Sequence, residues 1–378
     1  MKDQESKSLL KLSIHRLRRN PIAMAGFTMI LIYLMVAIAG PFIRLDKTPK
    51  ANDQYLELSI KRPGFKVLFF QVANEVSEQS LWSQWLYGRE KTSQSFPIYR
   101  YELLTDSILV ERYTGDDVNN GELLVYAYND LVSSNQLELH PSNLREQIKK
   151  ELISNTTFWL GTDRYGRDVL SRLMAGTWVS FTVGAISILI SLIIGIVVGA
   201  IAGYYRGRVD DLLVWLINVV WSIPTLLLVI AIALALGKGF WQVFVAVGLT
   251  MWVEVARVVR GQVISLREKE FIEAGKALGY THSRIIKKHV LPNVIGPVIV
   301  ISAANFASAI LVEAGLSFLG LGAQPPQATW GKMISEHKGY VITGDAYLAI
   351  LPGVAIFFLV FAFVLLGNGL RDALDTKA

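Results

Sequence analysis

The chain has 378 residues, of which 52% are hydrophobic and only 18% are charged, whereas soluble domains of this size carry about 25% charged residues. The charges are missing from a few long stretches, which is typical of membrane spans and excludes an ordinary soluble domain. The net charge of +6 does not indicate nucleic-acid binding, because the basic residues lie at the ends of apolar segments. The lack of cysteine excludes disulfides and thiol nucleophiles, and no histidine has metal-ligand spacing, so no metal site is expected.

Six apolar segments reach, or nearly reach, the length of about 20 residues that a helix needs to cross a bilayer. In chain order these predicted transmembrane helices are residues 22–43, 173–205, 212–237, 239–256, 290–312 and 346–370. We therefore expect an all-α polytopic membrane protein. Within these limits Glu254 is the only acidic or basic residue. Transporters driven by ions or protons need such residues inside the membrane, so we expect the energy to enter through another subunit.

The first apolar segment has a second interpretation, because Ala37-Ile38-Ala39 after a basic stretch resembles a signal-peptide cleavage site. A signal peptide has an apolar core of about 7–15 residues, and this segment is longer. We therefore expect a retained membrane anchor that follows a cytoplasmic N-terminus, residues 1–21.

Lys and Arg residues predict the orientation in the membrane. They are concentrated in residues 1–21, 206–211, 254–289 and 371–378. Because basic residues favour the cytoplasmic side, both termini of this multi-pass protein should be cytoplasmic.

Residues 44–158 differ from the rest in their pattern of apolar and polar residues and should lie on the extracytoplasmic side of the membrane. Short apolar runs at 66–72, 108–110 and 123–128 alternate with Gly, Asn and Asp clusters, which predicts β-strands. Residues 143–154 have apolar side chains four apart, which predicts a helix. We expect a small extracytoplasmic α+β insert; the alternative is an irregular loop with local hairpins.

A charged, glycine-containing run precedes the second span. The residues of this run that form a recognisable pattern are Gly161, Thr162, Asp163, Gly166, Arg167 and Asp168. The two glycines have the spacing of a phosphate-binding loop, but Arg167 stands where a Lys is required and Asp168 replaces the Ser/Thr that would hold magnesium. A nucleotide site is therefore not expected. The alternative is a capped lead-in to the span, with Asp163 at the helix start and Arg–Asp pairs as braces.

Gly195, Gly199 and Gly203 are spaced four apart in the second span. Small residues at this spacing let another helix approach closely. We expect a tight helix–helix contact, within this chain or with a partner, although glycine is common enough in membrane helices for chance to be the alternative.

The cytoplasmic loop 257–289 is the most informative segment. Its first part suits a helix that ends near Gly279. Ala274, Gly275 and Ala277 leave one side of that helix thin, so that it can enter a groove of another protein. The alternative is a solvated amphipathic loop that obeys the charge rule for cytoplasmic segments. A second short helix, capped by Thr281 or Ser283, should follow.

Catalytic residues are not expected. The sequence has no G-x-x-x-x-G-K-[ST] loop, no catalytic triad and no carboxylate pair that stands out. Substrate-binding residues are not identifiable from the sequence.

The cytoplasmic loop resembles the E-A-A-x-x-x-G…L-P signature of ABC importer permeases. The residues of this signature region are Glu273, Ala274, Gly275 (Ala in the commonest form), Ala277, Leu278, Gly279, Leu291 and Pro292. The L-G-T-D-x-x-G-R-D run and the later stretch 316–326 are similar to the oligopeptide/dipeptide/nickel branch, and the basic lead 16–21 is similar to the second permease of such systems. The resemblance covers residues 22–45 and 159–375 and says little about the insert.

The resemblance implies a type I ABC importer permease fold, with six transmembrane helices, the insert between helices 1 and 2, and a permease core at 159–378. It also implies partners: a homologous second permease, two cytoplasmic ATPase subunits that hold ATP and Mg, and an extracytoplasmic solute-binding protein. This chain would then have no cofactor of its own and would contact the lipid of the bacterial inner membrane. The signature loop would be the coupling helix that sits in a cleft of the ATPase, where Glu273 can accept a charge-assisted hydrogen bond.

Three functions remain open at this point. The first is a permease for peptides, and the second is a permease of the same family for nickel or another small solute. The third, from a different class, is an intramembrane sensor or enzyme whose outer insert binds a ligand, which would leave the signature loop unexplained.

Overall fold

The computed structural model describes residues 9–73, 80–88, 93–115, 117–131, 149–150, 152–237 and 239–374. The chain divides into two compact units. The helical unit comprises Met1–Ala37, Gly176–Pro325 and Thr329–Ala378, and the sheet unit comprises Ile38–Ala175 with Pro326–Ala328.

Five helical stretches in the described part of the chain are long and apolar enough to cross a membrane. They are α2 (Pro21–Ile43), α6 (Val169–Tyr205), α9 (Phe240–Arg267), the run His282–Phe318 that ends in α12 (Leu291–Phe318), and α15 (Tyr347–Leu374). A sixth span results if α7 (Gly207–Trp221) and α8 (Thr225–Leu236) together form one bent crossing. The chain is therefore a polytopic membrane protein.

The third predicted span, 212–237, is not one continuous helix. α7 ends at Trp221, α8 begins at Thr225, and the two axes differ by 90°. Pro224 lies at the break with an extended backbone (φ −53°, ψ 125°). Proline lacks an N–H and disfavours the helical conformation of the residue before it, so the helix stops there.

The fourth predicted span, 239–256, corresponds to the first part of α9, which continues as a helix to Arg267. Glu254 lies on an exposed face of the helix, whereas Val259 and Val263 on the opposite face are fully buried. A helix with one packed apolar face can continue past a charge that points away from that face.

The fifth predicted span, 290–312, lies within the longer helical run His282–Phe318. α12 continues to Phe318 and includes Glu313, which is only 2% exposed. The hydroxyl of Ser317, one turn later, donates to Oε1 of Glu313 at 2.6 Å. The predicted limits stop just short of this buried carboxyl group, because Glu313 was taken as the end of the apolar segment although it has a hydrogen-bond donor one turn away.

The three glycines of the ladder, Gly195, Gly199 and Gly203, face α9. A Cβ atom on Gly199 would lie 2.5 Å from the carbonyl oxygen of Ala256, and one on Gly203 would lie 2.8 Å from that of Arg260. Both distances are too short for any side chain. The backbones of α6 and α9 therefore approach each other directly, within this chain.

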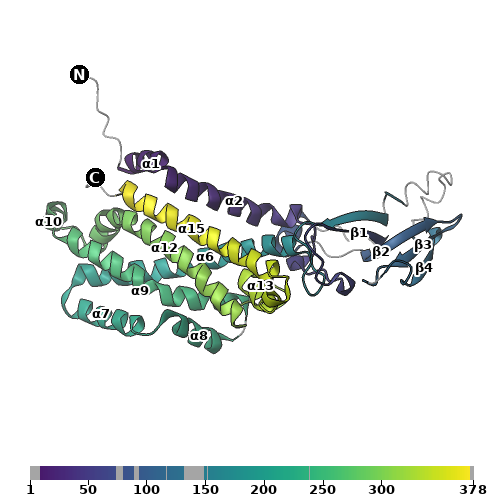
Figure 1. Ribbon diagram of the computed structural model, residues 1–378. Helices are drawn as coiled ribbons and strands as arrows, with labels where there is room; N and C mark the ends of the chain where they lie inside the picture. The colour runs from purple at the N-terminus through teal and green to yellow at the C-terminus, as the bar shows by residue number, and fades with distance from the viewer. Residues whose placement is uncertain are drawn as a thin grey trace, which may run out of the picture. The chain divides into compact units, whose positions relative to one another are not determined.

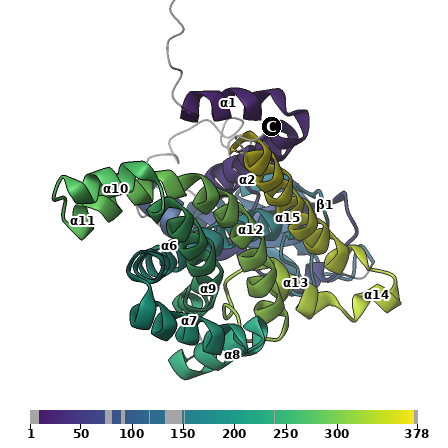
Figure 2. The same ribbon diagram turned by 90° about the vertical axis from the view of Figure 1, so that its left-hand side faces the viewer.

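The long helices of the helical unit pack lengthwise (Figure 1), with α12 in contact with α9, α15 and α13 (Trp330–His337). The short α14 (Tyr340–Thr343) also contacts α15. The amphipathic helix α1 (Leu9–Arg19), the end of α15 and α10 (Glu270–Ala277) lie at one end of this unit, and α13 lies at the other end (Figure 1). Figure 2 views the molecule from the first of these ends.

The sheet unit contains a five-stranded antiparallel sheet with the order β4-β3-β2-β1-β5. The strands are β1 (Phe65–Ala73), β2 (Ser93–Leu103), β3 (Ser107–Arg112), β4 (Leu123–Ala127) and β5 (Ile153–Phe158). The other elements of the unit are α3 (Leu81–Tyr87), α4 (Tyr128–Leu131) and the 3-10 turns η1 (Pro49–Ala51) and η2 (Leu56–Leu58). Ile108 and Val110 of β3 point to the same buried face, with Phe70 of β1 and Ile98 of β2, as strand alternation requires.

The α+β insert expected at 44–158 is seen in part as this sheet. The predicted strands at 66–72, 108–110 and 123–128 correspond to β1, β3 and β4, whereas β2 and β5 were not predicted.

The helix predicted at 143–154 falls largely outside the described residues, since 143–148 and 151 are not among them. Its C-terminal end was wrong. Ile153 and Ser154 begin β5 and pair with Phe70 and Phe69 of β1. Pairing with the free edge of β1 satisfies the backbone hydrogen bonds of these residues. This stabilises the strand more than the weak apolar spacing of the segment would stabilise a helix.

Candidate functional site

The segment predicted as a docking loop folds into two short helices joined by a glycine turn. α10 is followed by α11 (His282–Ile285) and by a π-helical turn, Ile286–Val290, that leads into α12. Figure 2 shows α10 and α11 projecting to one side of the helical unit. We refer to residues 268–290 as the α10–α11 loop.

Gly279 ends α10 in the left-handed conformation (φ +75°). The N–H of Gly279 donates to the carbonyl oxygen of Lys276 at 2.9 Å, and the N–H of Tyr280 donates to that of Gly275 at 3.0 Å. This is the Schellman arrangement, which satisfies the last carbonyl groups of a helix. A residue with a Cβ atom is strained at this φ, so the turn accounts for glycine at position 279.

The second helix is capped by Thr281, whose hydroxyl accepts from the N–H of Arg284; of the two predicted caps, Ser283 instead lies inside the helix. The guanidinium of Arg284 lies 4.1 Å from the ring centre of Tyr280. The Tyr280 ring stacks on His289, with 5.8 Å between ring centres and 15° between planes. These contacts hold the turn, α11 and the π-helical segment together.

The inner side of the α10–α11 loop packs on the ends of two long helices. Ile272 and Ile285 are almost fully buried, in one cluster with Val263 of α9. The hydroxyl of Tyr204 in α6 lies 2.9 Å from Nδ1 of His282. This last pair could not be predicted from the sequence, because its members lie far apart along the chain.

The outer side of α10 is apolar and exposed. Phe271, Ala274 and Leu278 lie three and four residues apart, and Phe271 and Leu278 are 45% and 71% exposed. The exposed Glu273 and Ala277 flank them. An exposed apolar stripe with one carboxylate, on a helix whose other side is fixed, is suited to docking against another protein.

Gly275 does not belong to this outer face. It is buried, and a Cβ atom there would lie 3.4 Å from the Tyr280 ring. Its small size therefore serves packing inside the loop. Leu291 is half-buried against the inner cluster, and Pro292 lies exposed in the first turn of α12, where its missing N–H costs nothing.

The charged run before α6 is organised around Asp163, which is 1% exposed. Its Oδ2 accepts from Nε of Arg167 at 2.6 Å, and its Oδ1 accepts from the N–H groups of Tyr165 and Arg167 at 2.8 and 3.0 Å. Nε of Arg172 lies 3.7 Å from Oδ2. One buried carboxylate thus balances two buried guanidinium groups.

The glycines of this run allow two chain segments to touch. Gly161 and Gly166 have φ angles of +73° and +70°, and a Cβ atom on either would collide with the carbonyl oxygen of Lys61 or Tyr55. Oγ1 of Thr162 accepts from the N–H of Lys61 at 2.8 Å. The glycines therefore serve local packing against 55–61 and not phosphate binding.

Asp168, and not Asp163 as predicted, caps α6. It immediately precedes Val169, the first residue of the helix, and its Oδ2 accepts from the N–H and the hydroxyl of Ser171 at 2.9 and 2.5 Å. No group of three or more His, Cys, Asp or Glu side chains within the described ranges is arranged to hold a metal ion.

Comparisons with known proteins agree with these features. Residues 195–378 match the family described as the inner membrane component of binding-protein-dependent transport systems. Residues 8–59 match the N-terminal transmembrane domain of oligopeptide transport permease C.

Individual relatives point in the same direction. The dipeptide transport system permease protein of Alkalihalophilus pseudofirmus is 40% identical over 247 residues, which cover 65% of this chain and 79% of the relative. The corresponding protein of Bacillus subtilis is 37% identical over 62% of this chain and 74% of its own length. A glutathione transport system permease protein of Pectobacterium atrosepticum is 39% identical over 59% and 74%, respectively.

Proposed function

Because this chain belongs to the peptide branch of the binding-protein-dependent ABC importer permeases, we propose that it imports peptides as one half of a pore whose other half is a homologous second permease. The named relatives transport dipeptides or glutathione, which favours a short peptide as cargo over nickel or another small solute. A solute-binding protein would deliver the cargo from outside.

The observation that carries this proposal is the exposed outer face of α10. Ala274 and Ala277 are small, Leu278 is 71% exposed, and Glu273 supplies a carboxylate. The inner side of the loop is fixed to α6 and α9. We propose that this face sits in a cleft of one of two separate ATPase subunits, which bind ATP and Mg. This chain would then be non-catalytic and would transmit ATPase closure to its long helices as a rigid-body movement.

The proposed topology has six transmembrane helices of the type I permease fold, with α7 and α8 together as the third. Both termini and the α10–α11 loop would be cytoplasmic. The clustering of α1, the end of α15 and α10 at one end of the helical unit (Figure 1) supports this orientation. The sheet unit would be extracytoplasmic, and we propose that it contacts the binding protein or the second permease.

Uptake measurements in a deletion strain that expresses variants test the coupling. Glu273→Lys reverses the charge on the docking face, and Gly279→Val strains the turn that positions this face. Both variants should insert normally but lose uptake of a radiolabelled dipeptide. The control is Asp372→Lys, which makes the same charge change at an exposed site near the end of α15. Normal uptake by both loop variants would refute the proposal.

Orientation is tested independently, because the natural chain has no cysteine and every introduced thiol is therefore unique. In spheroplasts, a membrane-impermeant maleimide should label Val118→Cys in the sheet unit and leave Ala274→Cys unlabelled until the cells are lysed. The reverse pattern would place α10 outside and exclude an ATPase contact.

A further inference from the structure

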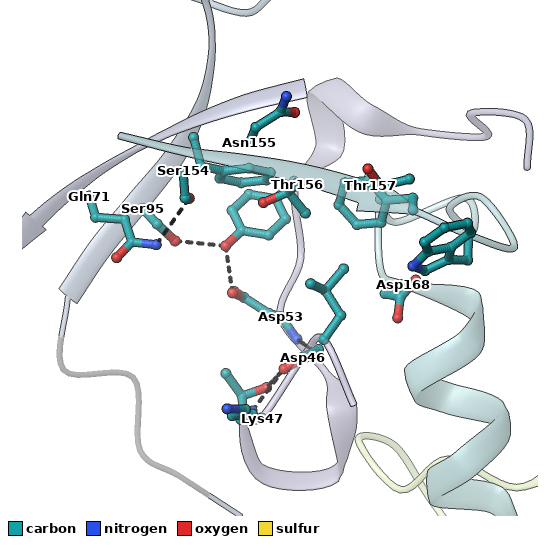
Figure 3. A pocket seen from close by; sticks show the side chains of 17 residues that line it. Asp46, Lys47, Asp53, Gln71, Ser95, Ser154, Asn155, Thr156, Thr157 and Asp168 are labelled. Atoms are coloured by element: carbon teal, nitrogen blue, oxygen red, sulfur yellow. Dashed lines mark hydrogen bonds between the residues drawn. The ribbon is translucent and has the colours of Figure 1, made fainter. Parts of the chain in front are cut away.

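The sheet unit contains a cavity of about 760 Å³ that the sequence analysis did not anticipate. It lies among the segment 45–55, strands β1, β2 and β5, and the start of α6. Its volume is in the range of sites for small organic ligands. Figure 3 shows the polar side chains that surround it.

Negative charge predominates in the lining. Three carboxylates, those of Asp46, Asp53 and Asp168, line the cavity together with one ammonium group, that of Lys47. Hydroxyl and amide groups of the strands, such as Ser95, complete the polar surface (Figure 3).

Two of the carboxylates, those of Asp46 and Asp53, accept hydrogen bonds from residues of the segment 45–55 itself. Asp46 accepts from the N–H and hydroxyl of Thr48 at 2.8 and 2.5 Å and from the N–H of Asp53 at 2.9 Å. Asp53 accepts from the hydroxyl of Tyr55 at 2.6 Å, and this hydroxyl lies 2.7 Å from that of Ser95. These groups form a pre-organised frame.

Asp168 is different. It is 4% exposed, and its Oδ2 is occupied by Ser171, but its Oδ1 has no hydrogen-bond partner among the described residues. Burial, with a smaller contribution from the nearby charge of Asp46, raises the pKa of Asp168 above its ordinary value. Asp168 lines the cavity, and a buried carboxylate with an unsatisfied oxygen is stabilised by a positively charged or hydrogen-bonding ligand beside it.

The neighbouring guanidinium groups are directed elsewhere. Nε of Arg167 is paired with Asp163, and its Nη1 donates to Asn52. Arg172 donates to the carbonyl oxygen of Ala51, and Arg44 donates to that of Thr48. None of these three arginines lines the cavity.

We propose that this cavity binds the ammonium group of an amino acid or short peptide, with the Asp168 carboxylate as an acceptor. The walls suit such a ligand, because Phe69, Phe158 and the 70% exposed Trp159 provide aromatic surface next to the carboxylates, and aromatic faces attract cations. A metal ion fits less well, since no three acidic side chains of the described residues are placed to share one. That the ligand is a peptide rests on the proposed function; that it carries an ammonium group rests on the cavity alone.

Calorimetric titration of the full chain in lipid nanodiscs tests the site without any partner subunit. The probe is alanyl-alanine amide, whose only charge is its ammonium group, and the matched probe is its N-acetylated form. The amide should bind, and acetylation should weaken binding by about tenfold or more, because it removes the charge-assisted hydrogen bond. Equal binding of both probes would overturn the proposal.

Two variants locate the site. Asp168→Asn should weaken binding of the probe at least about tenfold, and the control Asp117→Asn, at an exposed position of the same unit, should have no effect. If Asp168→Asn does not fold, Asn155→Lys serves instead, because Asn155 is exposed, lines the cavity, and its replacement brings an internal ammonium group to the site. Unchanged affinity in a folded Asp168→Asn or Asn155→Lys variant would sink the assignment.

Two further results would also overturn the assignment. The first is that the chain binds Ca²⁺ but gives no heat of binding with the amide. The second is that the natural chain does not bind the probe, while Asp168→Asn loses its association with the binding protein. The second would identify a docking socket for a basic side chain of a partner. The importer proposal is tested separately by the uptake of Glu273→Lys. The proposed ligand site can therefore be refuted while the importer proposal stands.

Discussion

Arg260 of α9 binds Asp210 of α7 through two parallel hydrogen bonds, with 2.6 Å between Nε and Oδ1 and 2.7 Å between Nη2 and Oδ2. The paired side chains are 31% and 13% exposed. Bidentate geometry fixes both partners more firmly than a single contact would. The pair therefore ties the start of α7 to the part of α9 that leads into the α10–α11 loop.

Asp210→Asn should destabilise this junction by about 2 kcal/mol, between the values for exposed and buried ion pairs. Thermal unfolding in detergent should show a lower melting temperature than the control Asp211→Asn, at an exposed neighbouring position. Arg260→Lys should lose part of the stability, because an ammonium group cannot form the parallel pair. A double charge swap that restores stability would show that the pair itself is responsible; equal melting temperatures of Asp210→Asn and its control would contradict this.

The membrane helices show which features could be predicted from the sequence and which could not. The apolar segments were recognisable because membrane spans leave a long compositional signal. Their ends were not, since α9 and α12 continue past Glu254 and Glu313. Whether a helix can include a charged residue depends on the helix face on which that residue lies and on hydrogen-bond partners such as Ser317. The hydropathy of a single sequence contains neither kind of information.

Glycine substitutions in α6 and α9 should have opposite signs. Gly199→Ala places a Cβ atom 2.5 Å from the carbonyl oxygen of Ala256, so the helices must separate at a cost of about 1–3 kcal/mol. Gly261→Ala, in the exposed middle of α9 with nothing within 4 Å of the new atom, should be neutral or stabilising by up to about 1 kcal/mol. Melting temperatures of the two variants in the same detergent measure the difference. A stable Gly199→Ala variant would show that the helices can move apart freely.

Replacement of the carboxylate at the centre of the charged run should be more damaging. Asp163→Asn leaves the buried Arg167 and Arg172 without their shared counter-charge, and breaking a buried pair costs about 3–5 kcal/mol. Limited proteolysis of the full chain should reveal faster cleavage within the sheet unit than in the exposed control Asp117→Asn. Identical cleavage rates would mean that the arginines find other acceptors.

The charged run before α6 also shows which parts of a site can be predicted from a sequence motif. Its residue types suggested helix capping and Arg–Asp pairing, and both occur, but the predicted cap Asp163 makes the ion pair and Asp168 is the cap. The cavity could not be predicted at all. Asp168 lies far along the chain from Asp46 and Asp53, and the lining residues of β5 join the cavity through the antiparallel pairing of β5 with β1.

Probe binding to the cavity should depend on pH through Asp168. Its pKa is raised in the folded chain, mainly by burial. As the pH falls through that raised pKa, a proton occupies the carboxylate in competition with the ammonium group, so affinity for alanyl-alanine amide should decrease. The other titratable groups of the lining are Asp46, Asp53, Tyr55 and Lys47. Burial raises the pKa of Tyr55 further above neutrality, so its hydroxyl keeps its proton throughout.

Because Asp46 and Asp53 also carry carboxylates, the diagnostic quantity is the difference between the natural chain and Asp168→Asn. Titrations at several pH values should give a steeper pH dependence for the natural chain. The stability of the ligand-free protein should show the opposite trend. A carboxyl group whose pKa is higher in the folded than in the unfolded state binds more protons when folded, so stability decreases as the pH rises between the two values. Asp168→Asn should remove this decrease, and added amide should offset it in the natural chain. A parallel pH profile for both proteins would show that another group controls the site.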